Sequence, residues 1–383
     1  MRTATYNRLA TNFVAFVLFL LLLSSCKKPV PGICNCNTGD YVYATSVFST
    51  GFNAPRGLKF GPDGYLYVAE AGIGGNNSST GCMQVPAPVG PYTGSDTGSR
   101  ISRVSPAGTR ETWVNGLPSS QTSPQNGGSP MGVADVAFIG NTLYGLLAGA
   151  GCSHGVPNIP NGVVRVNANH TWTGIADLSA FQQSNPVKNP NPPDFEPDGT
   201  WYSMVDVDNN LYAIEPNHGE LDKITAKGDI SRVIDISAFE GHIVPTAVTW
   251  YNGAFYVGNL DIFPIVAGSA SVFRVTPGGS ISTFATGFTT VVGVLFDELG
   301  GLYVLENTTG NQFPTPGTGD IIRVDPSGTR TTVASGLNLP TAMTMGPDNK
   351  IYVSVWGFGG APGTGEIDVV DISCAKQSTK LTK

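Results

Sequence analysis

Residues 60–70, FGPDGYLYVAE, are the stretch of sequence that decides the fold. An apolar run ends at Phe60, residues 61–64 have the composition of a turn, and a second apolar run begins at Leu66. Gly-Pro and Asp-Gly pairs between two short apolar runs are typical of a turn that joins antiparallel strands. The stretch therefore predicts a β-hairpin.

The second half of this hairpin recurs along the chain as an apolar residue followed by tyrosine. Its six copies are Leu66-Tyr67, Leu143-Tyr144, Leu211-Tyr212, Phe255-Tyr256, Leu302-Tyr303 and Ile351-Tyr352. From Tyr212 onward the copies are 44, 47 and 49 residues apart, and a propeller blade takes about 40 to 50 residues. The earlier copies are farther apart, which indicates inserted loops. The sequence therefore predicts an all-β fold, a six-bladed β-propeller of four-stranded antiparallel blades.

The two ends of the repeat region predict how the ring closes. The sixth unit has residues for three strands, whereas residues 46–52 closely resemble residues 282–288, which form a fourth strand in an earlier unit. We therefore expect the N-terminal strand to complete the last blade. The predicted divisions are a lipoprotein signal peptide at 1–25, a lipidated tether at 26–44, the propeller at 45–374 and a C-terminal tail at 375–383.

The N-terminal segment has the pattern of an export signal. Arg2 and Arg8 precede an apolar run at residues 13–23, which is shorter than the about 20 residues that span a bilayer. Small residues then precede Cys26, an arrangement that resembles the lipobox of bacterial lipoproteins. The resemblance implies that Cys26 carries lipid and that the protein is exported and anchored in the bacterial cell envelope, at the outer membrane. An ordinary export signal with an incidental cysteine is the alternative.

Charge and cysteine content narrow the classes of function. The formal net charge is −7, and an acidic chain is not expected to bind nucleic acid, whose phosphates require a basic surface. Besides the cysteine assigned to lipid, five cysteines remain, which allows at most two disulfides in an oxidising compartment. Cys82 and Cys152 belong to loops of adjacent units, and we expect them to pair. Ring closure would bring Cys34 and Cys36 near Cys374, with the pairing among these three left open.

The positions of the insertions predict which face of the propeller carries the function. Because successive strands are antiparallel, the loops from second to third strands and the loops between blades emerge on one face. The long insertions all belong to these two kinds of loop, at residues 71–99, 117–130, 149–161, 181–200, 261–269 and 307–319. Binding residues usually collect in loops above a rigid scaffold. We therefore expect a ligand site on this loop-rich face and an inert plain face, which carries short turns such as GPDG.

Oxygen-bearing residues recur at the loop-rich end of the second strand. They are Glu70, Glu215, Asn259 and Glu306, each three residues after the repeated tyrosine. Carboxylates that converge on a central channel could hold Ca²⁺ or Mg²⁺, with Glu70, Glu215 and Glu306 as the candidate ligands. The alternative is that each side chain satisfies backbone N–H groups of its own loop.

Five further residues are candidates for ligand binding. Asp135 and Asp198 lie near the starts of first strands, Trp201 and Tyr202 lie at the entry to the third unit, and His218 lies in a loop on the loop-rich face. Trp201 has a ring that could stack on a ligand, with core packing as the alternative.

Several short motifs resemble the ScyD/ScyE family of NHL-like propellers. They are Pro55-Arg56-Gly57-Leu58, Gly61-Pro62-Asp63-Gly64, Tyr202-Ser203-Met204, Val244-Pro245-Thr246-Ala247-Val248, Phe263-Pro264 with Gly268, Ala285-Thr286-Gly287-Phe288 and Gly363-Thr364-Gly365-Glu366. The resemblance extends from about Ser46 to Ile372 and implies the six-bladed fold. It implies no catalytic mechanism, because these motifs specify a fold and not a chemistry.

The sequence contains no nucleophile elbow, phosphate-binding loop or zinc-binding helix. We therefore interpret the chain as a lipid-anchored scaffold that binds a small molecule, glycan or protein on its loop-rich face, with the membrane as a second partner. The alternative is a propeller enzyme, similar to metal-dependent lactonases and hydrolases or to sugar dehydrogenases, by analogy of fold alone. A purely structural protein of the envelope is the third possibility.

Overall fold

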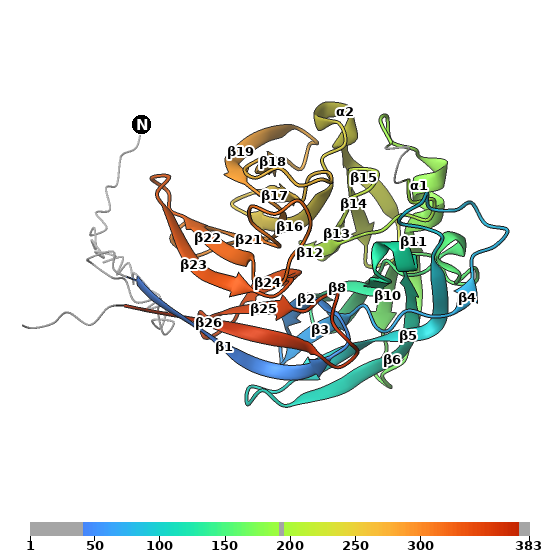
Figure 1. Cartoon of the computed structure of the whole chain (residues 1–383), viewed down its shortest axis with the longest axis horizontal. Coiled ribbons are helices and arrows are strands. Elements are labelled where there is room, and N and C mark those ends of the chain that lie inside the picture. Colours follow the sequence, from blue (N-terminus) through green and yellow to red (C-terminus); the bar gives the residue numbers. More distant parts are fainter. Residues whose placement is uncertain (1–40, 191–194, 375–383) are drawn as a thin grey trace, which may run out of the picture. The chain divides into compact units, whose positions relative to one another are not determined.

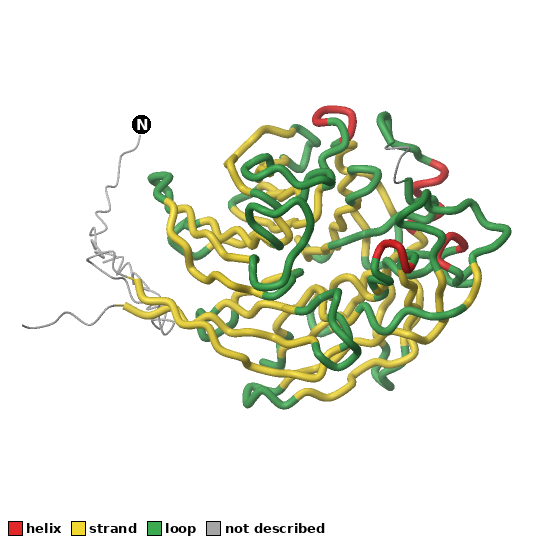
Figure 2. Tube along the Cα trace, in the orientation of Figure 1, coloured by secondary structure: helices red, strands yellow, loops and turns green. Residues whose placement is uncertain are grey.

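The structure, a computed structural model, describes residues 41–190 and 195–374. Its strands form six antiparallel sheets arranged around a centre (Figure 1), so the predicted six-bladed β-propeller is confirmed. Strands make up most of each blade, and helices are confined to short segments between them (Figure 2). Within the described ranges, no helix is long and apolar enough to cross a membrane.

Each blade begins with its innermost strand. Blade one contains β2 (Pro55–Phe60), β3 (Leu66–Glu70), β5 (Thr93–Val104) and β6 (Arg110–Gln121), with the short strands β4 (Asn77–Ser78) and β7 (Pro130–Met131). Blade two contains β8 (Val133–Ile139), β9 (Thr142–Leu147), β10 (Gly162–Val166) and β11 (Trp172–Asp177). Blade three contains β12 (Ser203–Val207), β13 (Asn210–Glu215), β14 (Glu220–Thr225) and β15 (Ile230–Asp235).

The remaining blades follow the same order along the chain. Blade four contains β16 (Pro245–Tyr251), β17 (Ala254–Asn259), β18 (Ala270–Val275) and β19 (Ile281–Phe288). Blade five contains β20 (Val291–Phe296), β21 (Leu302–Glu306), β22 (Gly319–Val324) and β23 (Arg330–Leu337). Blade six contains β24 (Ala342–Met345), β25 (Ile351–Val355), β26 (Gly365–Cys374) and β1 (Tyr41–Phe52). The helices are α1 (Leu178–Ser184) and α2 (Ser237–Glu240), with 3₁₀ turns at Pro124–Asn126 and Cys152–His154.

The apolar core consists of six clusters, and each cluster lies between two neighbouring blades. The second strands supply much of it. All residues of β3, β21 and β25 are buried, because each of these strands is covered on both faces. The cluster that joins blade six to blade one contains Phe52 of β1 with Leu66 and Val68 of β3. A blade therefore cannot bury its faces alone, which explains why the repeats close into a ring.

The ring closes as the sequence predicts. β1 is antiparallel to β26, with Tyr41 opposite Cys374 and Phe52 opposite Gly365 (Figure 1). Phe52 is fully buried. β1 begins at Tyr41, so residues 41–44, which the sequence assigns to the tether, belong to the propeller.

In blades one and six, the repeated tyrosine is hydrogen-bonded to the turn that precedes it on the plain face. Tyr67 Oη donates to Asp63 Oδ2 at 3.0 Å, and Tyr352 Oη makes the same 3.0 Å bond to Asp348 Oδ2. Gly64 of the first turn has a φ of 79°, a conformation that glycine adopts without strain. In these two blades the aspartate of a Gly-Pro-Asp turn is therefore linked to the tyrosine of the apolar-tyrosine pair.

Blade one departs from the predicted four strands. β5 and β6 each have 12 residues and are longer than most of their counterparts in the other blades. β4 pairs with β5, and β7 pairs with β6. Parts of the predicted loops at 71–99 and 117–130 are therefore strands, which extend this blade on the loop-rich face.

Candidate functional site

Glu70 lies at the loop-rich end of β3 and is fully buried. Its Oε2 accepts from the backbone N–H of Asn53 at 2.6 Å, and its Oε1 accepts from Arg100 Nε at 2.8 Å. Ser102 also donates to Oε1, and Arg110 Nη1 lies 3.5 Å from that atom. The carboxylate therefore joins the segment entering blade one to the third and fourth strands of the blade.

The corresponding residues of three other blades also bind their own loops. Glu215 accepts from the backbone N–H of Thr200 at 2.9 Å, and Glu306 accepts from the backbone N–H of Thr289. Asn259 donates to a backbone carbonyl at 2.9 Å and accepts from a backbone N–H at 2.7 Å. These polar side chains stabilise the entry loops of the blades.

The oxygen-bearing residues do not fit a shared cation site. Glu70, Glu215 and Glu306 lie in three separate blades, and each carboxylate is bound to its own loop. In residues 41–190 and 195–374, no three His, Cys, Asp or Glu side chains are grouped as metal ligands. The structure therefore supports the alternative role for these residues, the satisfaction of backbone N–H groups, in place of Ca²⁺ or Mg²⁺ binding.

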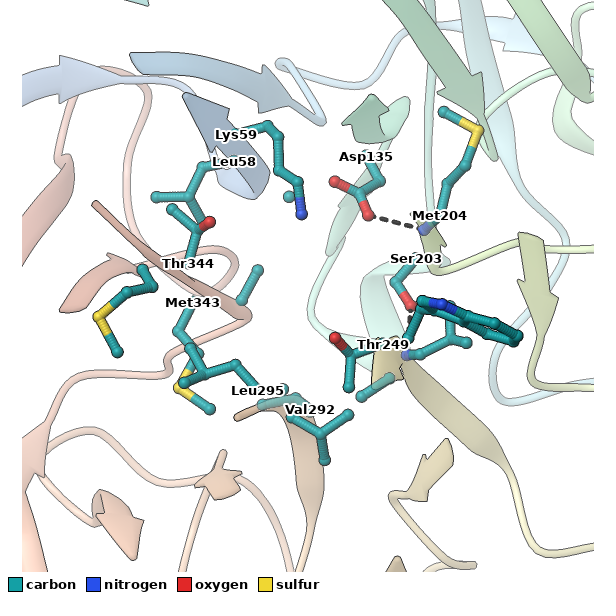
Figure 3. Close-up of a pocket in the computed structure, with 18 of the residues that line it drawn as sticks. Leu58, Lys59, Asp135, Ser203, Met204, Thr249, Val292, Leu295, Met343 and Thr344 are labelled. Carbon is teal, nitrogen blue, oxygen red and sulfur yellow. Dashed lines mark hydrogen bonds between the residues drawn. The ribbon is translucent and has the colours of Figure 1, made fainter. Parts of the chain in front are cut away.

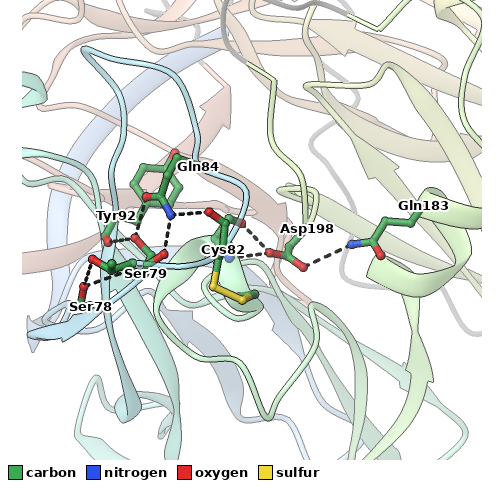
Figure 4. Close-up of a disulfide and its surroundings, with 10 residues drawn as sticks. Ser78, Ser79, Cys82, Gln84, Tyr92, Gln183 and Asp198 are labelled. Carbon is green, nitrogen blue, oxygen red and sulfur yellow. Dashed lines mark hydrogen bonds between the residues drawn. A yellow bond between two sulfur atoms is a disulfide. The ribbon is translucent and has the colours of Figure 1, made fainter.

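Asp198 and His218 belong to a buried polar network under the loops of blades one to three. Asp198 Oδ2 accepts from the backbone N–H and the hydroxyl of Ser153, at 2.7 and 2.6 Å. His218 Nε2 lies 3.0 Å from the backbone oxygen of Glu196. Figure 4 shows Asp198 between the disulfide and Gln183. Both candidates therefore hold loops together.

His154 lies in the same network. Its Nδ1 is 2.8 Å from Ser120 Oγ, and its Nε2 is 3.6 Å from Glu196 Oε2. The order serine, histidine, glutamate has the connectivity of a catalytic triad, but Ser120 and His154 are fully buried. Burial lowers the pKa of His154 to about 4. A substrate cannot reach this serine, so we assign the arrangement a structural role.

A disulfide joins Cys82 to Cys152, with their Cα atoms 5.5 Å apart (Figure 4). This is the pair expected from the loop positions, and it links an insertion of blade one to an insertion of blade two. Cys26, Cys34 and Cys36 lie outside the described residues, as do the signal peptide and the tail. Their lipidation and pairing stay predictions.

Trp201 and Tyr202 have different environments although they are adjacent. Trp201 is 1% exposed and packs in the core cluster between blades two and three, so the packing alternative holds for it. Tyr202 extends across the central channel instead, and its Oη donates to the backbone oxygen of Thr341 at 3.0 Å. Thr341 enters blade six, on the opposite side of the ring. Of the two candidates, only Tyr202 is placed to meet a ligand.

A cavity of about 780 Å³ opens on the loop-rich face, and we call it the loop-face cavity. Insertions of blades one, four and five form its walls. Phe263 and Phe313 stack with ring centroids 5.9 Å apart and ring planes 10° apart, and they are 50% and 60% exposed. Leu260, Ile262 and Phe358 add apolar surface. The wall is therefore apolar and rich in aromatic rings.

Arg56 and Tyr202 lie where the first strands enter the ring, and they form the floor of the loop-face cavity. Arg56 Nη2 donates to the backbone oxygen of Pro130 at 2.8 Å. Burial lowers the pKa of Arg56 from its usual value. Burial also raises the pKa of Tyr202 to about 12, although the neighbouring guanidinium acts in the opposite direction. The floor therefore presents a cation beside a neutral phenol.

A second cavity, of about 290 Å³, occupies the channel toward the plain face. The first strands of all six blades line it, and Figure 3 shows Lys59 and Asp135 pointing into it. The Asp135 carboxylate accepts from the backbone N–H of Met204 at 2.7 Å and of Val136 at 2.8 Å. Asp135 is thus on the channel, as its position in the sequence suggested. The sequence predicts an inert plain face, so this cavity is a feature that the sequence did not predict.

We predict that Asp135→Asn changes how stability depends on pH. Burial raises the pKa of Asp135 to about 7, and the two backbone N–H groups and Lys59 only partly oppose it. An unfolded aspartate has a pKa of about 4, so folding takes up a proton between these values. The contribution of Asp135 to stability is therefore full below about pH 4 and is lost as the pH rises through about 7. The loss is on the order of 4 kcal/mol.

Urea unfolding of the wild type and Asp135→Asn at pH 5 and pH 8 measures this effect. The asparagine has no charge to bury, so the variant gains stability relative to the wild type as the pH rises. Asp96→Asn, at an exposed position, is the matched control. An unchanged difference between wild type and Asp135→Asn at the two pH values would contradict the prediction.

The sequence predicts a site among the insertions of the loop-rich face, but it did not indicate the residues that line the cavity there. Phe263 and Phe313 lie in the predicted insertions at 261–269 and 307–319, and aromatic rings in two long insertions were the available signal. Arg56 belongs to a motif that served only to support a family resemblance. A positively charged residue directly after the entry proline of a first strand could have indicated the channel.

Comparisons with known proteins support the fold. No family model matches the chain, and no curated protein matches it. A Bacteroides thetaiotaomicron protein of unknown function has a TM-score of 0.55 at 13% identity, covering 87% of this chain and 77% of its own. A putative glucose dehydrogenase of Thermus thermophilus has a TM-score of 0.53 at 14% identity, covering 86% and 100%. A Xanthomonas campestris gluconolactonase has a TM-score of 0.50 at 9% identity, covering 86% and 90%. At these identities the likeness concerns the fold alone.

Proposed function

We propose that this protein binds a small molecule in the loop-face cavity. The observation that carries the proposal is the cavity itself, with about 780 Å³ of space, an aromatic wall and a polar floor. Small-molecule sites are usually concave, mostly apolar and about 300 to 1,000 Å³ in volume, with a few polar groups that orient the ligand. The position of the cavity above the channel, among the insertions, agrees with a binding role for the loop-rich face.

Exposed apolar side chains at the wall of the cavity indicate the chemistry of its ligand. The stacked rings of Phe263 and Phe313 stand at its wall, and Ile262 is 52% exposed beside them. Exposed apolar side chains gathered at one place mark binding sites on soluble proteins. A ligand that covers these rings gains free energy by removing apolar surface from water. The ligand therefore has an apolar, partly aromatic body.

Phe313→Ala is expected to weaken the binding of N-phenyl-1-naphthylamine, a neutral fluorescent probe, by about tenfold, because an aromatic contact contributes about 1 kcal/mol beyond its buried area. Fluorescence titration of the purified protein measures the affinity. Phe239→Ala is the matched control, because Phe239 is also exposed, at 63%, but lies on α2 outside the cavity. Failure of the wild type to bind the probe, or equal weakening by both variants, would count against the proposal.

Anchoring in the envelope completes the proposed role. The support comes from the sequence, where small residues precede Cys26 after an apolar run. Lipid on Cys26 would hold the propeller at the membrane through a tether, and membership of the ScyD/ScyE family is proposed on the motifs given above. Mass spectrometry of the mature N-terminus tests the anchor: Cys26→Ser removes the lipid if the assignment is right, and a lipidated variant would refute it.

The enzyme alternative is tested by turnover. Assays with a lactone, and with an aldose together with an electron-accepting dye and a redox cofactor, each with and without added Ca²⁺, address the hydrolase-like and dehydrogenase-like chemistries. Product formation that the Phe313→Ala variant reduces would show that the loop-face cavity is a catalytic pocket, and the binding proposal would then be replaced.

A further inference from the structure

Arg56 is a channel arginine that, among the described residues, has no acidic partner. Arg100 pairs with Glu70 at 2.8 Å, and Arg323 pairs with Asp297 at 3.0 Å. Among the residues that the structure describes, no carboxylate lies within ion-pair distance of the Arg56 guanidinium. Its charge is therefore balanced by no nearby described side chain.

The contacts that hold the Arg56 guanidinium in place use only some of its N–H donors. Nη2 donates to the backbone oxygen of Pro130 at 2.8 Å, and Cζ lies 5.9 Å from the centre of the Phe358 ring. The neighbouring Tyr202 hydroxyl donates its proton to the backbone oxygen of Thr341, and its oxygen accepts a hydrogen bond from the Arg56 guanidinium. Arginine carries five N–H donors in a rigid planar fork. At the floor of the loop-face cavity, the remaining donors are available to a ligand.

Asn307 is a second residue of this cavity whose side chain can accept a further hydrogen bond. Its Nδ2 donates to the backbone oxygen of Pro340 at 2.6 Å. Its Oδ1 is buried and has no hydrogen-bond partner among the described residues. A buried acceptor without a partner costs free energy, and a ligand hydroxyl or amine in the cavity would satisfy it.

A cation that has been moved out of water is costly unless an anion pairs with it. Burial lowers the pKa of Arg56, and Tyr202 supplies the interactions that oppose this shift. An anion at the floor of the cavity would recover the lost solvation through charge-assisted hydrogen bonds. Arginine forms such bonds in pairs with planar carboxylates and with phosphate.

We propose that Arg56 recognises an anionic group of the ligand. The ligand is then an amphipathic acid, with an apolar body against Phe263 and Phe313, a carboxylate, sulfonate or phosphate on Arg56, and an O–H or N–H donor toward Asn307. This inference rests on the proposed function, because it assigns the chemistry of the molecule that the loop-face cavity binds.

Two fluorescent probes with the same rings test the inference. 8-Anilino-1-naphthalenesulfonate carries an anionic group, and N-phenyl-1-naphthylamine lacks it. The wild type is expected to bind the sulfonate about 10- to 100-fold more tightly, the range of a hydrogen bond between charged groups. Arg56→Met is expected to abolish this preference, so that the ratio of the two affinities falls to about one. Arg56→Lys, which keeps the charge but loses the fork, is expected to retain part of the preference.

The outcomes separate the inference from the proposed function. Equal affinities of the wild type for the two probes, or a preference that persists in Arg56→Met, would overturn the role of Arg56 and leave the binding proposal standing. No binding of either probe would overturn both. If Arg56→Met fails to fold, the salt dependence of the wild type tests the inference instead. High salt screens charges, so it should weaken the binding of the sulfonate probe and leave the binding of the neutral probe unchanged. Equal responses of both probes to salt would refute the inference.

Discussion

A protein that begins at Asn53, and so lacks β1, is expected to lose cooperative folding. β1 is the fourth strand of blade six and supplies Phe52 to the cluster that joins blades six and one. Loss of one buried phenylalanine side chain costs about 3 to 5 kcal/mol, and a whole protein is stable by only about 5 to 15 kcal/mol. The deletion also exposes the edge of β26, and unpaired edges promote aggregation.

A protein that begins at Tyr41 is the control for this deletion. It removes the residues before the propeller and keeps the whole of β1. Circular dichroism on heating and size-exclusion chromatography compare the two proteins. The Tyr41 protein should melt in one sharp transition, and the Asn53 protein should aggregate or melt without one. A sharp transition of the Asn53 protein within a few degrees of the control would refute the role of β1 in closing the ring.

Glu70→Ala is expected to lower the free energy of unfolding by about 3 to 5 kcal/mol, the cost of leaving a buried ion pair without one partner. The substitution leaves the side chain of Arg100 without its carboxylate and the N–H of Asn53 without its acceptor. Both groups are near the junction of blades six and one. Urea unfolding followed by tryptophan fluorescence measures the change.

Glu111→Ala is the matched control for Glu70→Ala. Glu111 also accepts from an arginine, Arg103, but its side chain is 54% exposed. Exposed ion pairs contribute about 0 to 1 kcal/mol, so this variant should remain close to the wild type. If Glu70→Ala were as mild as Glu111→Ala, the carboxylate would not be structural, and its role in ligand or cation binding would have to be considered again.

The fold could be predicted from the sequence because each repeat carries its own local signals. The turn residues at 61–64, the apolar-tyrosine pair and the spacing of the copies each specify strands and turns over short distances. The likeness of residues 46–52 to a fourth strand then predicted the closure. The extra pairing of β4 and β7 with blade one was not predictable, because it depends on contacts of the long β5–β6 hairpin and not on a local pattern.

The candidate site was predicted less completely, for a physical reason. A carboxylate at a strand end, such as Glu70 or Glu215, has the same sequence appearance whether it faces a channel or binds its own loop. Burial and backbone partners distinguish the two roles, and only the structure shows them. The aromatic wall is likewise formed by residues far apart in the chain, Phe263 and Phe313, whose contact no spacing rule predicts.

A crystal of the protein soaked with 6-bromo-2-naphthoate tests the central claim most directly. Anomalous scattering locates the bromine. We expect a bromine peak in the loop-face cavity beside Phe263 and Phe313, with the carboxylate in contact with Arg56. A bromine peak confined to the plain-face cavity beside Lys59 and Asp135, or no bound naphthoate at a concentration that saturates binding in solution, would contradict it.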